Sequence, residues 1–236
     1  MNEPSKNISY IYKFEFADRS KKEFVVKLDA KTLNLIRIEK KDNPEWTELA
    51  YQKCPNCSLD EKKHKYCPVS ASLIDIVEFF RDSMSYDEAD LVIECSERGY
   101  LKHTTLQQAI SSLIGIYMVT CGCPVMEKLK PMVRFHLPFA SIEETKYRAI
   151  SMYLTAQYFM QKNGKEPDWE LKNLAKIYDD VHIVNDSICR RLTGIKVRDA
   201  SLNALVRLDF FTSNINMAVT KEKIREIELL FEAYFK

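Results

Sequence analysis

Short runs of aromatic and β-branched residues dominate the first third of the chain. Residues 10–16 (YIYKFEF) and 23–28 (EFVVKL) are two such runs, and the polar segment ADRSKK joins them, which is typical of a β-hairpin. Residues 34–39 (NLIRIE) are a possible third strand. A second hairpin is indicated at 90–95 (DLVIEC) and 99–103 (GYLKH). The pattern therefore predicts a small antiparallel sheet.

Two segments near the middle of the chain carry the spacing of helices. The first helix is expected at about residues 72–82, between the two hairpins. Thr104 and Gln107 stand three residues apart, as the two ends of a capping box do, and an apolar run follows. A second helix is therefore predicted from Thr104 to about Thr120.

A third and longer helix is predicted from a second capping box. Ser141 and Glu144 have the required spacing, and the helical pattern continues to about Gly164. Residues 149–160 (AISMYLTAQYFM) are apolar on nearly every face of this helix. Because a helix that is apolar all round is normally buried, we expect it in the middle of the core.

Three more helices are indicated in the last third of the chain. Residues 161–168 (QKNGKEPD) are the clearest loop, and the next helix is expected to start at Pro167 and Asp168. Two further helices are expected, at 199–215 capped by Asp199 and at 220–235 capped by Thr220. The helix after the loop carries a stripe with steps of three and four residues: Leu171, Leu174, Tyr178, Val181, Asn185, Ile188 and Leu192.

The β-rich part, residues 1–103, passes into the helical part, residues 104–236, without a recognisable linker. The chain, residues 1–236, is long enough for a sizeable core. We therefore predict a single α+β domain. A small N-terminal antiparallel sheet would pack on a C-terminal helical bundle, and a Cys-rich metal site would join the two.

The charge balance of the chain restricts its partners. Lys and Arg number 35 and Asp and Glu 34, so the formal net charge is +1. This balance gives no electrostatic reason to expect nucleic acid or acidic lipid as a partner. The sequence also lacks the P-loop, Rossmann, nucleophile-elbow and H-E-x-x-H motifs, which makes the common nucleotide enzymes and metalloproteases poor candidates.

Two features bear on the compartment. Residues 104–126 carry no charge and are long enough to cross a bilayer, but their Thr, Gln and Ser residues favour a buried core helix. The first ten residues have no apolar stretch of the kind that a secretory signal needs. We therefore expect a cytoplasmic protein with no membrane partner, and seven cysteines that remain reduced.

Three cysteines and a histidine lie within residues 54–67 (CPNCSLDEKKHKYC). Cys54 and Cys57 form a C-P-x-C knuckle, whose tight turn can direct two thiolates at one ion. The presence of Cys67 ten residues later favours metal binding over redox chemistry. Zinc is the expected metal because sulfur-rich sites suit it, and an iron–sulfur cluster is the alternative.

We predict that Cys123 supplies the fourth metal ligand. A proline follows each of Cys54, Cys67 and Cys123 directly, and it favours the same extended conformation in all three. Pro124 is also expected to begin a helix over residues 124–133 with Cys123 as its N-cap. The N-terminus of that helix would favour a thiolate.

Other cysteines and one histidine leave alternatives open. His64 lies inside the first cysteine stretch, although its neighbours form the most charged run in the chain. Cys121 could replace Cys123, since C-x-C can present either sulfur. Cys121 and Cys123 could also act together as a thiol redox sensor without metal. Cys95 and Cys189 are interpreted as core side chains.

Residues 134–145 (RFHLPFASIEET) contain candidates for catalysis. His136 lies close in sequence to Glu143 and Arg148, and a histidine beside a carboxylate can perform acid–base chemistry. A structural interpretation competes with this one. Glu144 already has a capping role and is spaced to form an ion pair with Arg148, and His136 could bond to the backbone of a Leu-Pro turn.

Three polar residues interrupt apolar helices: Gln157, Asn185 and Asn203. Buried polar groups need hydrogen-bond partners. These three side chains could pair with one another between helices, or they could line a pocket for a small ligand.

The strings CPNC, YCPVS, CGCP, KPMVRFHLPFASIEETKYR and DASLNALVRL together make the chain similar to a bacterial protein family of unknown function, from Tyr10 onward. The resemblance implies a bacterial cytoplasmic protein and no particular activity. We interpret the chain as a metal-stabilised binding or regulatory protein, with zinc as the metal and an unknown protein or small molecule as partner. The alternatives are an enzyme that uses His136, Glu143 and Arg148, and a thiol redox sensor.

Overall fold

The computed structural model of the chain describes residues 7–37, 42–218 and 221–236. The strands are β1 (Asn7–Phe16), β2 (Lys21–Asp29), β3 (Glu88–Glu94) and β4 (Gly99–Thr105). Within the described residues there are seven α-helices: α1 (Pro68–Phe79), α2 (Leu106–Thr120), α3 (Lys130–Arg134), α4 (Ile142–Lys162), α5 (Lys172–Thr193), α6 (Ala200–Ala218) and α7 (Lys221–Glu228). Short 3-10 helices are η1 (Glu45–Thr47), η2 (Met126–Leu129) and η3 (Leu229–Tyr234). The predicted α+β class is confirmed.

The four strands form one antiparallel sheet in the order β2-β1-β3-β4, so both predicted hairpins are present. β1 lies inside the sheet, and its Ile11 is opposite residues of both β2 and β3. Tyr10, Tyr12 and Phe14 alternate along β1 with less buried residues and face the core. The expected third strand at 34–39 is absent from residues 34–37, and residues 38 and 39 lie outside the described part of the chain.

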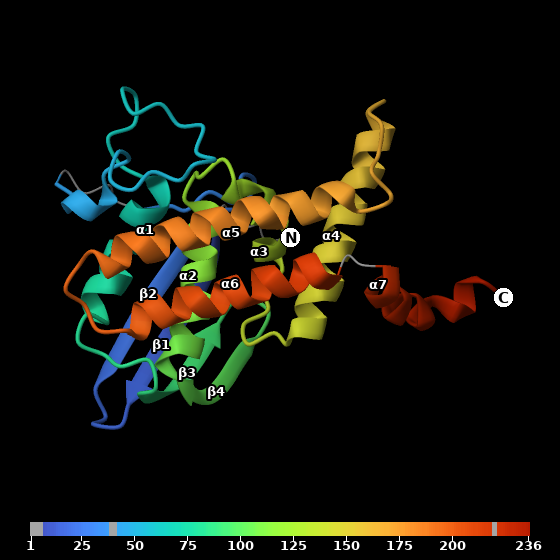
Figure 1. Cartoon of the computed structure of the whole chain (residues 1–236). Coiled ribbons are helices and arrows are strands. Elements are labelled where there is room, and N and C mark those ends of the chain that lie inside the picture. Colours follow the sequence, from blue (N-terminus) through green and yellow to red (C-terminus); the bar gives the residue numbers. More distant parts are fainter. Residues whose placement is uncertain (1–6, 38–41, 219–220) are drawn as a thin grey trace.

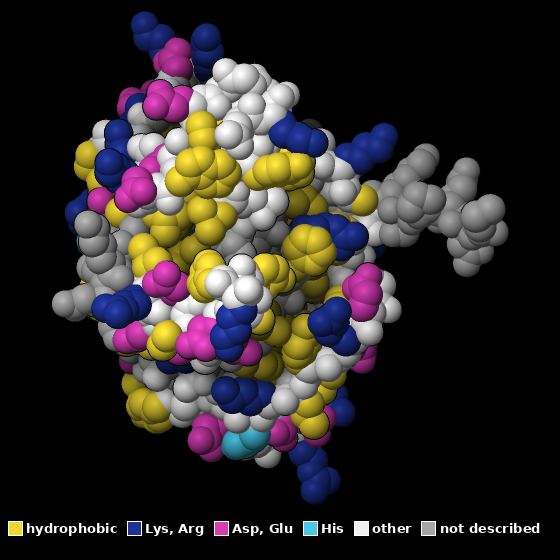
Figure 2. Space-filling view, turned by 90° about the vertical axis from the view of Figure 1, so that its right-hand side faces the viewer, with side chains coloured by type: hydrophobic (Ala, Val, Ile, Leu, Met, Phe, Trp, Pro, Cys, Tyr) yellow, Lys and Arg dark blue, Asp and Glu magenta, His cyan; other side chains and the backbone are white. Residues whose placement is uncertain are grey.

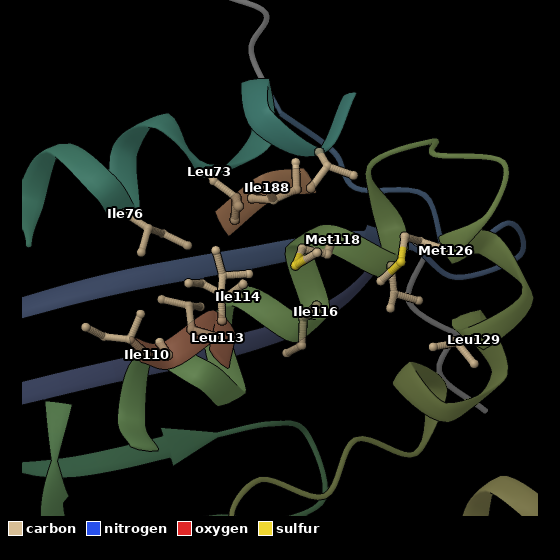
Figure 3. Close-up of a cluster of buried hydrophobic side chains, with 14 of the residues drawn as sticks. Leu73, Ile76, Ile110, Leu113, Ile114, Ile116, Met118, Met126, Leu129 and Ile188 are labelled. Carbon is tan, nitrogen blue, oxygen red and sulfur yellow. The ribbon is translucent and has the colours of Figure 1, made fainter. Parts of the chain in front are cut away.

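α2 is the central helix, and it lies between the sheet and the pair formed by α5 and α6 (Figure 1). Leu113 and Ile114 of α2 are fully buried, and they meet Leu73 and Ile76 of α1 (Figure 3). The uncharged stretch that suggested a membrane span is thus mostly a core helix, as predicted. Among the described residues no helix combines the length and the apolar character that crossing a membrane requires.

The capping box predicted at the start of α2 is not formed, and the N-cap lies one residue later than expected. Thr104 belongs to β4, and Thr105 is the N-cap without a side-chain capping bond. The Thr104 hydroxyl instead donates to Oε1 of Gln108 at 3.0 Å. The capping box of α4 is confirmed, because Ser141 accepts from the amide of Glu144 and the Glu144 carboxylate accepts from the amide of Ser141.

α4 does not occupy the middle of the core, which corrects the prediction made from residues 149–160. Tyr158, Phe159 and Met160 are exposed, and only four residues of the helix are buried. α2 already fills the position against the sheet. α4 therefore packs at the margin, against α3 and α6.

The apolar stripe of α5 is confirmed, since all seven of its residues are buried. The helix begins later than expected because Leu171 adopts a left-handed conformation (φ 59°) immediately before it. The first helix starts earlier than expected, at Pro68, and Cys67 is its N-cap. Near the C-terminus the helix α7 ends at Glu228 and continues as η3, while Thr220 lies outside the described residues.

Candidate functional site

A cavity of about 220 Å³ lies among the helices, and we call it the central cavity. Its wall comes from β4, from α2, η2, α3, α4, α5 and α6, and from the loop at 135–140. Most of the lining side chains are apolar, and Met118, Met126 and Met132 are among them. Figure 2 views the molecule from the side of α4 and α7, where hydrophobic side chains gather around a hollow and Lys and Arg side chains lie among them.

His136 lines the central cavity at the turn that follows α3. Its Nε2 atom lies 2.6 Å from the hydroxyl of Tyr12 and 3.4 Å from Oγ of Ser112. Its ring meets the ring of Tyr10 edge-on, with 5.3 Å between the centroids. Burial lowers the pKa of His136 to about 3, and the positive charge of Arg148 acts in the same direction, so the imidazole is neutral.

Arg148 lines the same cavity from α4. Its Nη2 atom donates to the carbonyl oxygens of Met132 at 3.0 Å and Phe135 at 2.8 Å. The expected ion pair with Glu144 is not formed, since Glu144 caps the helix instead. Arg148 thus joins α4 to the segment that carries His136.

Glu143 does not belong to the cavity. Its side chain is exposed and pairs with Lys146 at 2.8 Å. Of the three catalytic candidates, the structure therefore brings His136 and Arg148 to one cavity and leaves the carboxylate outside it.

The three polar residues in apolar helices have separate partners rather than one another. Gln157 accepts from the backbone amide of Asp168, and Asn203 donates to Asp199 at the start of α6. Asn185 donates from α5 to Asp209 and Thr212 of α6. Only Asn185 lines the central cavity. Residue spacing could not identify these partners, because each depends on how the chain turns back on itself.

Sequence reasoning missed Tyr12, which contacts His136 without lining the cavity, and three of the polar residues that do line it. Tyr12 and Ser112 hold the imidazole of His136, and Ser112 interrupts the apolar pattern of α2. Lys102 and Arg207 also line the cavity, and their charges were indistinguishable from those of surface residues in the sequence.

A second and much smaller cavity, of about 10 Å³, lies between the cysteine segments, and we call it the thiol cavity. Cys54, Cys57, Cys67 and Cys123 all line it. Three of them are buried, with exposed fractions of 9% for Cys54, 6% for Cys67 and 8% for Cys123. A volume of this size accommodates about one water molecule or one ion. The structure thus brings together the four residues predicted as metal ligands.

Local hydrogen bonds position these cysteines. The amide of Cys57 donates to the carbonyl of Cys54 at 3.0 Å, which closes the predicted knuckle turn. The amide of Cys67 donates to the carbonyl of Thr47 at 2.8 Å and fixes the base of the loop. Asn56 ties the knuckle to α5 by donating to the carbonyl of Asp180.

Cys123 is not the N-cap of an α-helix, which corrects the prediction for residues 124–133. A turn follows it, and then come η2 and the short α3. The amide of Glu127 donates to the carbonyl of Cys123 at 3.0 Å. The Cys-Pro helix start that was expected here occurs at Cys67 instead.

The alternative ligands lie elsewhere. His64 is exposed, and Cys121 donates its thiol to the carbonyl of Met118; neither lines the thiol cavity. Burial raises the pKa of Cys121, and it raises the pKa of Cys123 to about 11. Both thiols are therefore protonated in the structure as described, which gives a thiolate-based redox sensor no support.

The seven cysteines, all within the described part of the chain, form no disulfides. As the side chains are placed, no group of three or more His, Cys, Asp or Glu residues among those described is arranged to hold a metal ion. Closure of the thiol cavity around an ion would therefore require the sulfur atoms to move toward one another. The metal site stays a prediction.

The fold and the two cavities define an α+β protein that carries a mainly apolar cavity and, separately from it, a second cavity lined by thiols. The domain of unknown function DUF6901 matches residues 10–232, and the chain belongs to this family. No curated protein and no solved structure matches the chain. The prediction that the chain belongs to a family of unknown function is thus confirmed. Membership of this family assigns no activity to the chain.

Proposed function

We propose that the protein is a metal-stabilised binding protein of the cytoplasm, which holds zinc in the thiol cavity and a small molecule in the central cavity. Four thiol side chains from three separate segments line a cavity of single-ion size, and the described lining contains no His, Asp or Glu. Sulfur donors of this number favour zinc. An iron–sulfur cluster would need more room than about 10 Å³, so zinc is preferred over the cluster.

The single observation that carries the proposal is that Cys123 lines the thiol cavity and directly precedes a segment that lines the central cavity. Cys123 lines the thiol cavity, and the segment directly after it, through Met126, Leu129 and Val133, lines the central cavity. A metal ion held by Cys123 would therefore fix the start of the segment that forms one wall of the ligand site. Metal binding and ligand binding would be coupled through this segment.

Acid–base catalysis at His136 is the second candidate. His136 lines the central cavity together with Arg148 and Asn185, which is the arrangement that such an enzyme would need. Against it, no carboxylate from the described residues lines the cavity, and the imidazole is held by Tyr12 and Ser112. A base with a pKa of about 3 is also far from the range in which proton transfer is efficient near pH 7. Binding is therefore preferred over catalysis.

Elemental analysis of reduced protein, purified without chelators, is expected to find about one zinc per chain. Cys123→Ser should lose the zinc and unfold at a lower temperature, because one thiolate ligand is removed. Cys189→Ser is the matched control, since Cys189 does not line the thiol cavity, and it should keep the metal. His64→Ala should keep it as well.

Two results would contradict the metal site. The first is the absence of both zinc and iron from the wild-type protein. The second is loss of metal from His64→Ala with full retention in Cys123→Ser, which would make residues 54–67 a self-contained site.

A further inference from the structure

The central cavity has a mainly apolar wall, and the charged side chains of its described lining are all cations. Three methionines, Met118, Met126 and Met132, contribute flexible apolar surface that can adapt to the shape of a ligand. Phe139 and Phe211 add aromatic surface. Such a wall suits the hydrocarbon part of a small molecule.

Arg148 brings a positive charge into this apolar surrounding without a carboxylate partner. Its two hydrogen bonds to the described residues both leave from Nη2 and both end on neutral carbonyl oxygens, of Met132 and Phe135. The N–H groups of Nε and Nη1 make no hydrogen bond to the described residues and can donate to a ligand. Burial lowers the pKa of Arg148, which is the direction expected for a cation whose charge is not compensated.

Two more cations line the cavity. Arg207 lies over the ring of Phe211, with 5.5 Å to the centroid, and burial lowers its pKa. The exposed Lys102 lies over the ring of Phe139, with 5.3 Å to the centroid. None of the three cations forms an ion pair with a carboxylate of the described residues, and the described lining contains neither Asp nor Glu. Because an uncompensated charge in apolar surroundings costs free energy, a bound anion would relieve it.

We infer that the central cavity binds a small organic anion, with a carboxylate beside Arg148 and an apolar body against the methionine-rich wall. The inference rests on the proposed binding function and names the class of ligand. His136 contributes a neutral ring to the wall and its Nε2 atom is already held by the hydroxyl of Tyr12, so the cations alone recognise the charge of the ligand.

The volume of the cavity limits the size of the ligand. We assume that each non-hydrogen atom of a ligand takes about the space of one water-sized sphere, roughly 10–15 Å³. The cavity of about 220 Å³ then holds on the order of 15 to 20 such atoms. A nucleotide is too large and too polar for this wall. A medium-length fatty acid or an aromatic acid of similar size fits both the volume and the charge.

Calorimetric titration of the purified protein with decanoate, near neutral pH and below the micelle concentration, tests the inference. Decanoate is expected to bind at least roughly tenfold more tightly than decanol, which has the same chain without the charge, because a charge-assisted hydrogen bond supplies about that ratio. Inorganic phosphate should not compete with decanoate, since it lacks the apolar body.

Arg148→Gln and Arg207→Gln, made separately, are expected to reduce the preference for decanoate over decanol. Arg207→Gln keeps the test informative if Arg148→Gln folds poorly, since Arg207 makes no hydrogen bond to the described backbone. Arg190→Gln is the matched control. Arg190 lies outside the cavity, where it is partly exposed and pairs with Asp186, and its loss should leave both affinities unchanged.

Equal affinities for decanoate and decanol would overturn the inference. Displacement of decanoate by inorganic phosphate would also overturn it. Failure of decanoate to bind folded, zinc-containing protein would also overturn it while leaving the metal site intact. Conversely, decanoate binding to protein that contains no zinc would support the inference and contradict the metal part of the proposed function.

Discussion

Replacement of Arg191 by leucine is expected to lower the free energy of unfolding by about 3 to 5 kcal/mol. Arg191 belongs to α5 and is fully buried. Its Nη1 atom donates to the carbonyl oxygens of Trp46 at 2.9 Å and Glu48 at 2.7 Å, and its Nη2 atom donates to that of Leu49 at 3.2 Å. The substitution removes three charge-assisted hydrogen bonds and leaves carbonyl groups without partners. Urea unfolding followed by circular dichroism measures the change.

The neighbouring arginine is the control for this substitution. Arg190 is half-exposed and pairs with Asp186 one turn earlier in the helix, so Arg190→Leu should cost less than about 1 kcal/mol. Similar effects of the two substitutions would mean that Arg191 does not hold the loop that precedes Cys54.

The role of Arg191 connects stability to the thiol cavity. Its three acceptors lie directly before the loop that carries Cys54 and Cys57, and the amide of Leu49 bonds to the far side of the same loop, at Lys65. Arg191 thus holds the base of the loop against α5. Loss of this contact would free two of the four thiols from their place in the cavity.

The elements with a clear period could be predicted from the sequence. β1 alternates buried and half-buried residues, β2 alternates buried and exposed residues, and the stripe of α5 repeats at three and four residues. Each pattern arises because one face of the element is buried, and the spacing of apolar residues along the chain shows this directly. Their positions in the structure agree with the prediction to within a few residues.

The placement of helices could not be predicted in the same way. The apolar run of α4 indicated a core helix, yet the position against the sheet belongs to α2. Apolar content shows that a helix has surface to bury, but it does not show which of two such helices lies nearest the sheet. Because α2 occupies the position against the sheet, Tyr158 and Phe159 of α4 stay exposed.

The two cavities differ in how much of them the sequence revealed. The Cys-Pro context of Cys54, Cys67 and Cys123, and the short spacing of Cys57 from Cys54, suggested one site, and all four cysteines line the thiol cavity. His136 and Arg148 were found as candidates from their residue types alone. The partner of His136 is Tyr12, which is 124 residues distant and carries no local signal of that contact.

The half-buried His136 should make the protein lose stability as the pH falls. Its pKa is about 3 in the folded protein and about 6.5 when the chain is unfolded, so between these values the unfolded chain binds the additional proton. The stabilising contribution is therefore complete above pH 6.5 and is lost as the pH falls toward 3. Arg148 strengthens the effect by opposing a second positive charge, and the neighbouring Tyr10 and Tyr12 stay protonated throughout because burial raises the pKa of each.

His136→Gln removes this titration and keeps a side chain that can bond to the hydroxyl of Tyr12. Between pH 6.5 and about 4.5 the wild-type protein is expected to lose roughly 2 to 3 kcal/mol more than the variant, at about 1.4 kcal/mol for each pH unit. Carboxylates whose pKa is lowered in the folded protein, such as Glu144 and Asp168, titrate in both proteins and cancel in the difference. His64→Gln, at an exposed site, is the control and should follow the wild type. If urea unfolding gave parallel stability curves for wild type and His136→Gln across this range, the imidazole would be accessible to protons in the folded protein, and the central cavity would be open to water at that point.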